Sequence, residues 1–303
     1  MADTKIQITD EKVDELRPLV EQLRLIDDTF FEKVMEDKDV CEEVIRIIME
    51  DPGLSIREVN PQESVHNLQG RSVRLDVLCE RSDGAYINVE LQRADNDDHF
   101  KRVRYHASCI TANVTEPGER FKNVRDVCVI YISEFDIFKR GKTIYHVSHV
   151  VKETEGEVDP VYVDDGFTSI YVNTAIDDKT EIAELMNCFL QTKVDNPKFP
   201  KLSNRVAQFK EDEEGVREMC AIVEEYANKK VNESKKEWIK EGKREGIEIG
   251  KAEGIIKSLR KYNVPNYDIR EEIQNQLEIP EEDAQRYIEM FTDEEYKFPN
   301  NGI

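Results

Sequence analysis

Five short segments rich in β-branched and aromatic residues lie between residues 72 and 174, and this is what most restricts the fold. They are SVRLDVLC, AYINVEL, DVCVIYIS, TIYHVSHVV and TSIYVNT, and turn residues separate them. Such composition and length are typical of β-strands. One helical pattern interrupts them over about residues 97–112, and its apolar positions at the spacing of one helix face are Phe100, Val103, Ala107 and Ile110. The region therefore predicts a mixed α/β domain.

Helical patterns stand on both sides of the predicted strands. Upstream lie LRPLVEQLRLI and FFEKVMEDKDVCEEVIRIIME, and downstream lies EIAELMNCFLQT. The second segment is expected to be one helix that ends at Asp51-Pro52-Gly53, since proline lacks a backbone donor and glycine permits a turn. We expect these elements to form one domain over residues 1–208.

The remaining third of the chain is charged and predicted to be helical. Residues 209–262 contain a repeat in which glycine recurs every fourth residue, at positions 242, 246, 250 and 254. Glycine costs about 1 kcal/mol per helix position relative to alanine. The repeat therefore indicates either a close helix–helix contact or a weakly helical linker, and Trp238 in the same segment is an interface or core anchor. Residues 263–303 are expected to form a small helical hairpin.

Composition excludes several classes of protein. The formal net charge of −22 rules out nucleic-acid binding by bulk electrostatic attraction. No apolar run approaches the roughly 18 residues of a membrane span, and MADTKIQITD lacks a signal-peptide core. Six cysteines are scattered singly without a CxxC pair, which argues for reduced thiols in the cytoplasm and against a zinc site. Four histidines likewise form no metal-ligand set: His99, His106, His146 and His149.

Residues 71–92 predict a β-hairpin with two carboxylates side by side. Strand alternation places Val73, Leu75 and Val77 on one face and Ile87, Val89 and Leu91 on the matching face of the second strand. A three-residue loop, Ser82-Asp83-Gly84, pairs residues whose numbers sum to 166. Asp76 and Glu90 are therefore expected directly opposite each other, with Cβ atoms about 5 Å apart.

Two like charges in this position destabilise the sheet unless something offsets their repulsion. A divalent cation would do so, because carboxylate oxygens and water are the ligands that Mg²⁺ uses. Gln92 projects from the same face as Glu90 and could orient a water molecule or contact a phosphate oxygen. The alternative is an exposed polar face on which Asp76 pairs with Arg74 or Arg71.

A basic, aromatic helix follows the hairpin directly, in the stretch HFKRVRYH over residues 99–106. Its cations could reach a phosphate that a metal holds. Residues 71–150 contain 13 Lys and Arg against 12 Asp and Glu, so the acidity of the chain lies outside this segment. A locally basic groove is therefore compatible with the overall charge.

These residues resemble the PD-(D/E)XK nuclease family transposases, the group that includes recombination-promoting nucleases. The resemblance rests on RLDVLCE, a short turn, INVELQ, and a helix with Phe100, Arg102 and Tyr105, and it extends through DVCVIYIS to the glycine-periodic tail. It implies a restriction-endonuclease-like core, which is a mixed central sheet flanked by helices, here with an all-helical C-terminal extension. It also implies Mg²⁺- or Mn²⁺-dependent hydrolysis of DNA phosphodiesters.

The resemblance assigns roles to particular residues. Asp76 and Glu90 match the metal-binding acids, and Gln92 stands where the family motif commonly has lysine. Glutamine offers a dipole where lysine offers a positive charge, so this position departs from the pattern. The substrate phosphate would be contacted from the basic helix, by Arg102, Arg104 and Tyr105. A further acid on the first core helix often completes such sites, and four residues could supply it: Glu32, Glu36, Glu42 or Glu43.

Two functions of different classes are compatible with the sequence. The first is an active endonuclease of the recombination-promoting or transposase-like type, acting on DNA and forming a homodimer through the C-terminal helices. The second is a catalytically inactive nuclease-fold module that binds DNA or protein and regulates it. Gln92 and the overall acidity favour the second function, whereas the intact Asp76–Glu90 pair and the basic helix favour the first.

Overall fold

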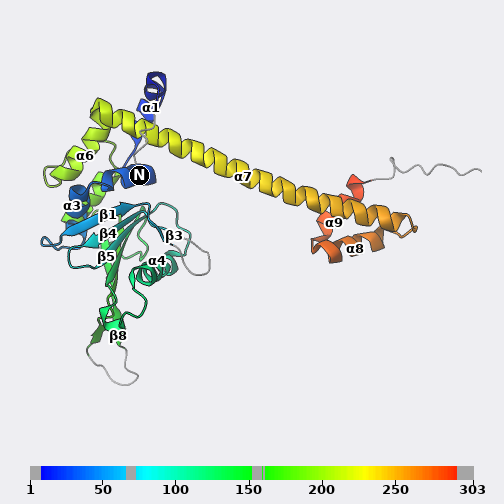
Figure 1. Cartoon of the computed structure of the whole chain (residues 1–303), viewed down its shortest axis with the longest axis horizontal. Coiled ribbons are helices and arrows are strands. Elements are labelled where there is room, and N and C mark those ends of the chain that lie inside the picture. The colour runs from blue at the N-terminus through cyan, green and yellow to red at the C-terminus, as the bar shows by residue number, and fades with distance from the viewer. Residues whose placement is uncertain (1–7, 66–72, 152–158, 160, 292–303) are drawn as a thin grey trace, which may run out of the picture. The chain divides into compact units, whose positions relative to one another are not determined.

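The computed structural model describes residues 8–65, 73–151, 159 and 161–291, and the chain divides into two compact units, Met1–Tyr226 and Ala227–Ile303 (Figure 1). The division falls within α7 (Glu213–Arg260), after Tyr226. It lies there because Val216, Met219 and Cys220, in the first turns of α7, are buried in the core of the first unit.

The first unit is a mixed α/β fold. Its helices are α1 (Asp10–Gln22), α2 (Asp28–Met35), α3 (Lys38–Ile48), α4 (His99–Val114), α5 (Glu181–Leu190) and α6 (Pro200–Glu211), with a 3₁₀ turn at Phe121–Asn123. Its strands are β1 (Ile56–Pro61), β2 (Ser64–Val65), β3 (Val73–Arg74), β4 (Val77–Arg81), β5 (Tyr86–Gln92), β6 (Val127–Ser133), β7 (Ile144–Val147), β8 (His149–Val151), β9 (Val161–Val163) and β10 (Phe167–Asn173).

A six-stranded sheet forms the centre of this unit, in the order β1-β4-β5-β6-β10-β7. The β5–β6 and β6–β10 pairs are parallel, and the other three pairs are antiparallel. Helices pack on both faces: the larger core cluster joins one face to α1–α3, α5, α6 and the start of α7, and a second cluster joins the other face to α4. This arrangement confirms the expected restriction-endonuclease-like core.

Several predicted elements differ from those observed. The single helix expected over residues 30–50 is two helices, because the side chain of Asp37 accepts hydrogen bonds from the N–H groups of Asp39 and Val40 and so begins α3. The strand expected over residues 143–151 is broken at Ser148, since β7 pairs with β10 whereas β8 pairs with β9. β1 and α6 were not predicted at all.

The C-terminal extension is helical, as expected. α7 is one continuous helix, and its end packs with α8 (Asn266–Leu277) and α9 (Glu281–Met290) around a small apolar cluster that includes Ile256, Ile273 and Tyr287. Trp238 is 78% exposed, so it anchors no core within the described residues. None of the helices that the structure describes is long and apolar enough to cross a membrane.

Candidate active site

The hairpin of β4 and β5 has the register that its loop length predicts. The N–H of Arg81 donates to the carbonyl of Ala85, and Gly84 takes a φ of +89°, the left-handed conformation that suits glycine. Val77 lies opposite Val89, so paired residue numbers sum to 166. The three-residue loop is thereby confirmed.

Asp76 stands at the entrance to β4, immediately before its first paired residue. Its Oδ2 accepts a hydrogen bond from the backbone N–H of Leu91 at 2.8 Å, which fixes the carboxylate beside β5. The predicted strand face of Val73, Leu75 and Val77 is wrong, because the strand is interrupted here: Leu75 packs in the α4-side cluster, whereas Val77 packs in the larger one.

Glu90 is buried on the face of the sheet that α4 covers, with 5% of its surface exposed. Its Oε1 accepts a hydrogen bond from Nδ2 of Asn88 at 2.8 Å and lies 3.2 Å from Nδ1 of His106, outside hydrogen-bond alignment. The alternative of an exposed polar face is therefore wrong for Glu90. Arg74 lies 4.0 Å from Glu32, and Arg71 lies outside the described residues.

The environment of Asp76 is unfavourable for a negative charge. Burial raises the pKa of its carboxyl group well above the usual value, and the charge of Glu90 raises it further. The N–H of Leu91 opposes this rise, whereas the charges of Asp28 and Glu32 add to it. Three acidic side chains therefore act on the carboxyl group of Asp76.

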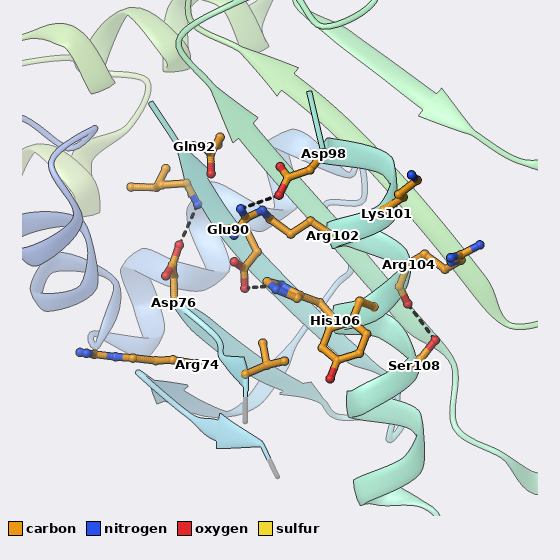
Figure 2. A pocket seen from close by; sticks show the side chains of 13 residues that line it. Arg74, Asp76, Glu90, Gln92, Asp98, Lys101, Arg102, Arg104, His106 and Ser108 are labelled. Atoms are coloured by element: carbon orange, nitrogen blue, oxygen red, sulfur yellow. Dashed lines mark hydrogen bonds and ion pairs between the residues drawn. The ribbon is translucent and has the colours of Figure 1, made fainter. Parts of the chain in front are cut away.

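A cleft of about 720 Å³ opens beside the two carboxylates. The residues predicted to bind the metal, the water and the phosphate all line it, namely Asp76, Glu90, Gln92, Arg102, Arg104 and Tyr105, together with Lys101 and His106. None of the four candidate acids of the N-terminal helices lines it. Figure 2 shows Asp76 and Glu90 on the strand side and Lys101, Arg102 and Arg104 on α4. The folded chain thus brings the acids and cations together across one opening.

The cationic side chains on α4 differ in whether they already pair with an acidic residue. Arg102 donates from Nη2 to Oδ2 of Asp98 at 2.9 Å. Lys101 and Arg104 are exposed, and neither makes an ion pair with any described residue. These two side chains can bind an anion without first breaking a contact within the chain.

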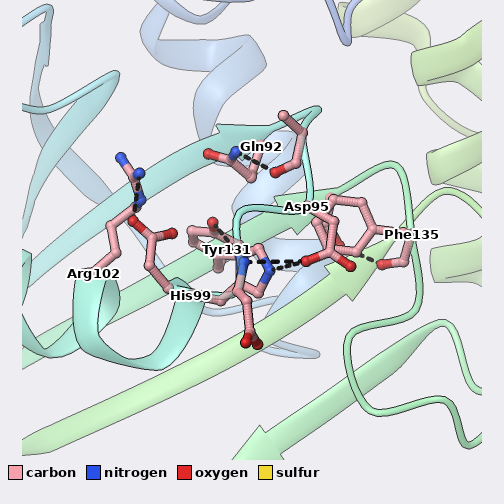
Figure 3. Close-up of polar contacts among 10 residues, drawn as sticks. Gln92, Asp95, His99, Arg102, Tyr131 and Phe135 are labelled. Carbon is pink, nitrogen blue, oxygen red and sulfur yellow. Dashed lines mark hydrogen bonds and ion pairs between the residues drawn. The ribbon is translucent and has the colours of Figure 1, made fainter. Parts of the chain in front are cut away.

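Gln92 has a fixed orientation at the rim of the cleft. Its Nε2 donates to the backbone carbonyl of Ala94 (Figure 3). The amide oxygen then remains available, since Oε1 accepts no hydrogen bond from the described residues. Gln92 therefore presents an acceptor to the cleft, where a lysine would present a positive donor.

The four candidate acids of the N-terminal helices have different surroundings. Glu42 accepts from the N–H of Ile56 and pairs with Arg46, and Glu43 accepts from the N–H of Leu202 at the start of α6. Glu36 pairs with Lys33. Only Glu32 is among the charges that act on Asp76, and it also accepts from the side chain of Gln62.

The donor set at Asp76 and Glu90 suits a hard divalent cation. Each carboxylate accepts through one oxygen, and the second oxygen of each accepts nothing from the described residues. Within those same residues no three His, Cys, Asp or Glu side chains stand close enough to form a metal cluster by themselves. A cation here would therefore take two carboxylate oxygens plus water or phosphate oxygens, which is how proteins commonly bind Mg²⁺.

Two histidines of α4 contribute to the site in ways that sequence spacing did not show. His106 meets Glu90, as described above. His99 lies between Oδ1 of Asp95, 2.9 Å from Nε2, and the hydroxyl of Tyr131, 3.0 Å from Nδ1 (Figure 3). These two contacts link the first turn of α4 to Tyr131 on β6, which is paired with Glu90 in the sheet. They therefore hold the basic helix over the acids.

Comparison with known families agrees with this geometry. The family model of the PD-(D/E)XK nuclease family transposases matches residues 31–174, which contain the whole central sheet, α4 and the cleft acids. The resemblance read from the sequence is confirmed for this part of the chain. No curated protein and no solved structure matches the chain.

Proposed function

We propose that this chain, whose residues 31–174 match the PD-(D/E)XK nuclease family transposases, is a metal-dependent endonuclease that hydrolyses DNA phosphodiester bonds. The observation that carries the proposal is the cleft itself. Two adjacent carboxylates, Asp76 and Glu90, face unpaired cations from α4 across a single opening. The carboxylates can hold a divalent metal ion, and the lysine and arginine side chains can hold a phosphate. Metal-dependent hydrolysis of a phosphodiester requires both.

Asp76 and Glu90 would hold Mg²⁺ or Mn²⁺ through their available oxygens, and Glu32 is the best placed of the four candidate acids to complete the site. When bound, the cation polarises the scissile phosphate and lowers the pKa of a water molecule. His106, whose Nδ1 lies 3.2 Å from Oε1 of Glu90, would stay in contact with this carboxylate. Catalysis in the cytoplasm fits six cysteines that are all free thiols.

The remaining residues of the cleft would bind and orient the substrate. Arg104 and Arg102 bind phosphate oxygens, Arg102 while it stays in contact with Asp98, and Tyr105 completes the same surface. The Oε1 atom of Gln92 would accept a hydrogen bond from the attacking water and so orient it toward the phosphate. A lysine at this position would contribute a positive charge, whereas Gln92 would contribute by positioning the water.

A homodimer formed through α7 would place two clefts on one DNA. Apolar side chains stand exposed along this helix, including Trp238, Ile239 and Ile247. An added Cβ at any of the four periodic glycines meets no described atom within 4 Å, so packing within the chain does not explain them. These features support the close helix–helix contact, made between two copies.

A plasmid-nicking assay tests the catalytic proposal. The full-length protein should nick plasmid DNA with Mg²⁺ or Mn²⁺ and not with EDTA, and Asp76→Ala or Glu90→Ala should reduce the rate at least about 100-fold. Glu80→Gln is a matched control, because Glu80 lies on the same hairpin, pairs with Arg57 and does not line the cleft. DNA binding without metal-dependent nicking would contradict the proposal and leave the inactive binding module as the better account.

A further inference from the structure

Phe100 is an exposed aromatic side chain beside the cations of the cleft. The apolar pattern of α4 placed it on one face with Val103, Ala107 and Ile110, and those three residues are buried. Phe100 is instead 53% exposed. The ring therefore contributes less to the core than its position in the pattern predicts.

The ring is held in a fixed position by other aromatic side chains. Its centroid lies 5.5 Å from that of Phe138, tilted at 54°, and 5.5 Å from that of Tyr171, at 64°. Phe138 in turn packs on Tyr145 at 4.7 Å. Because neither contact of Phe100 is a face-to-face stack, the ring remains open to a flat partner while its support prevents it from moving.

Three cations lie near this ring along the chain. Arg104 stands one helical turn beyond Phe100 on the same side of α4, Lys101 is its neighbour in the chain, and Lys139 directly follows Phe138. All three side chains are exposed, and none makes an ion pair within the part of the chain that the structure describes. An aromatic platform among free cations is how proteins bind single-stranded nucleic acid, with bases on the rings and phosphates on the cations.

A base can stack on a protein ring only if its own face is uncovered. In a duplex both faces of each base are covered by its neighbours, so a fully paired strand offers Phe100 no partner. We propose that Phe100 stacks on an unpaired base of the strand whose phosphates Lys101 and Arg104 contact, so that the preferred substrate is DNA with single-stranded nucleotides next to the cleft. This rests on the proposed function, which makes DNA the ligand.

Binding measured without cleavage tests the inference. Full-length protein in EDTA would be titrated into a fluorescein-labelled duplex and into the same duplex carrying a single-stranded gap. The wild type should prefer the gapped DNA, and Phe100→Ala should weaken binding to it roughly tenfold while changing affinity for the intact duplex less than twofold. Phe100→Trp should keep the preference. Phe121→Ala removes a ring that is 95% exposed elsewhere, and should change neither affinity.

A fluorescent base analogue in the gap gives a second readout. The emission of 2-aminopurine should be quenched by the wild type and by Phe100→Trp, and not by Phe100→Ala, since stacking on the ring causes the quenching. Equal affinity of the wild type and Phe100→Ala for gapped DNA, or an equal loss on both DNAs, would overturn the inference in favour of a purely electrostatic or protein-binding surface.

The outcomes separate this inference from the proposed function. Metal-dependent nicking without any preference for gapped DNA overturns the inference alone. A preference that depends on Phe100, found together with no cleavage of any DNA, supports the inference and overturns the endonuclease proposal. Failure to bind either DNA, found together with no metal-dependent nicking, overturns both.

Discussion

Oδ2 of Asp76 accepts a hydrogen bond from the backbone N–H of Leu91, and this contact holds the carboxylate next to Glu90, one residue earlier on β5. Burial and the charge of Glu90 both raise the pKa of Asp76, so an ionised carboxylate here opposes folding. A site whose residues are held in place at a cost to stability is typical of binding and catalysis.

The first prediction is that Asp76→Asn stabilises the metal-free protein. Asparagine keeps the shape and can accept the same hydrogen bond from Leu91, but it carries no charge beside Glu90. In EDTA we expect the free energy of unfolding to rise by about 1 kcal/mol, measured by urea denaturation. Calorimetry should show that the variant no longer binds Mn²⁺. Glu80→Gln serves as the control, and lower stability of Asp76→Asn than of the wild type would contradict the electrostatic account.

The second prediction concerns Gln92→Lys, which restores the commoner residue of the family motif. If Gln92 only orients water, the variant should nick plasmid DNA at the wild-type rate or faster, because lysine adds a positive charge near the phosphate. Initial nicking rates at saturating Mg²⁺ measure this, and circular dichroism checks the fold. Loss of nicking in a folded variant would show that the amide oxygen has a role that lysine cannot fill.

The third prediction separates the acids on the first helices. Glu32→Gln should lower the nicking rate at least about tenfold, because its charge acts at Asp76. Glu36→Gln should stay within about twofold of the wild type, since Glu36 is exposed and pairs with Lys33. The two variants differ by one turn of α2, which makes them a matched pair. Equal rates for both would remove Glu32 from the site.

The register of the hairpin was predictable because the length of its loop fixes it. Val77 pairs with Val89, and their residue numbers add up to the predicted 166. The burial of Glu90 was not predictable, because it depends on α4 folding over that face from a later part of the chain. The interruption at Leu75 left no signal either, since apolar and polar residues alternate through it. Local patterns thus specify registers and helices, whereas coverage of a face depends on tertiary packing.

The exposure of Phe100 escaped prediction for a related reason. Helical spacing groups Phe100 with Val103, which is buried. The chain after β6, however, brings Phe138 beside the first turn of α4, and the ring of Phe100 packs against it. For α7 the sequence pattern was sufficient to predict a helix and insufficient to place its first turns. In the sequence nothing distinguishes Val216 and Met219 from other apolar residues of α7. Only the structure shows that they are buried in the larger core cluster.

The fourth prediction follows from those first turns of α7. A chain that ends at Gln208 loses Val216, Met219 and Cys220, all of which are buried with 1% or less of their surface exposed. It should unfold or aggregate, because each buried side chain of this kind stabilises the fold by about 1.5–3 kcal/mol. A chain that ends at Tyr226 keeps them and should melt cooperatively. Thermal melts of both fragments measure this, and equal stability would mean that these residues are dispensable.

The fifth prediction is that α7 joins two copies of the chain through its glycine face. Sedimentation should give a dimer for the full-length protein and a monomer for the fragment ending at Tyr226. Gly246→Leu with Gly250→Leu should also give a monomer, because bulky side chains prevent two helix backbones from approaching closely, and double-strand cutting should then fall relative to nicking. Arg244→Leu adds the same bulk on the opposite side of the helix and should remain dimeric. If the glycines only lower helix stability, Gly246→Leu with Gly250→Leu would instead stiffen α7 and leave sedimentation unchanged, and the segment would be a linker.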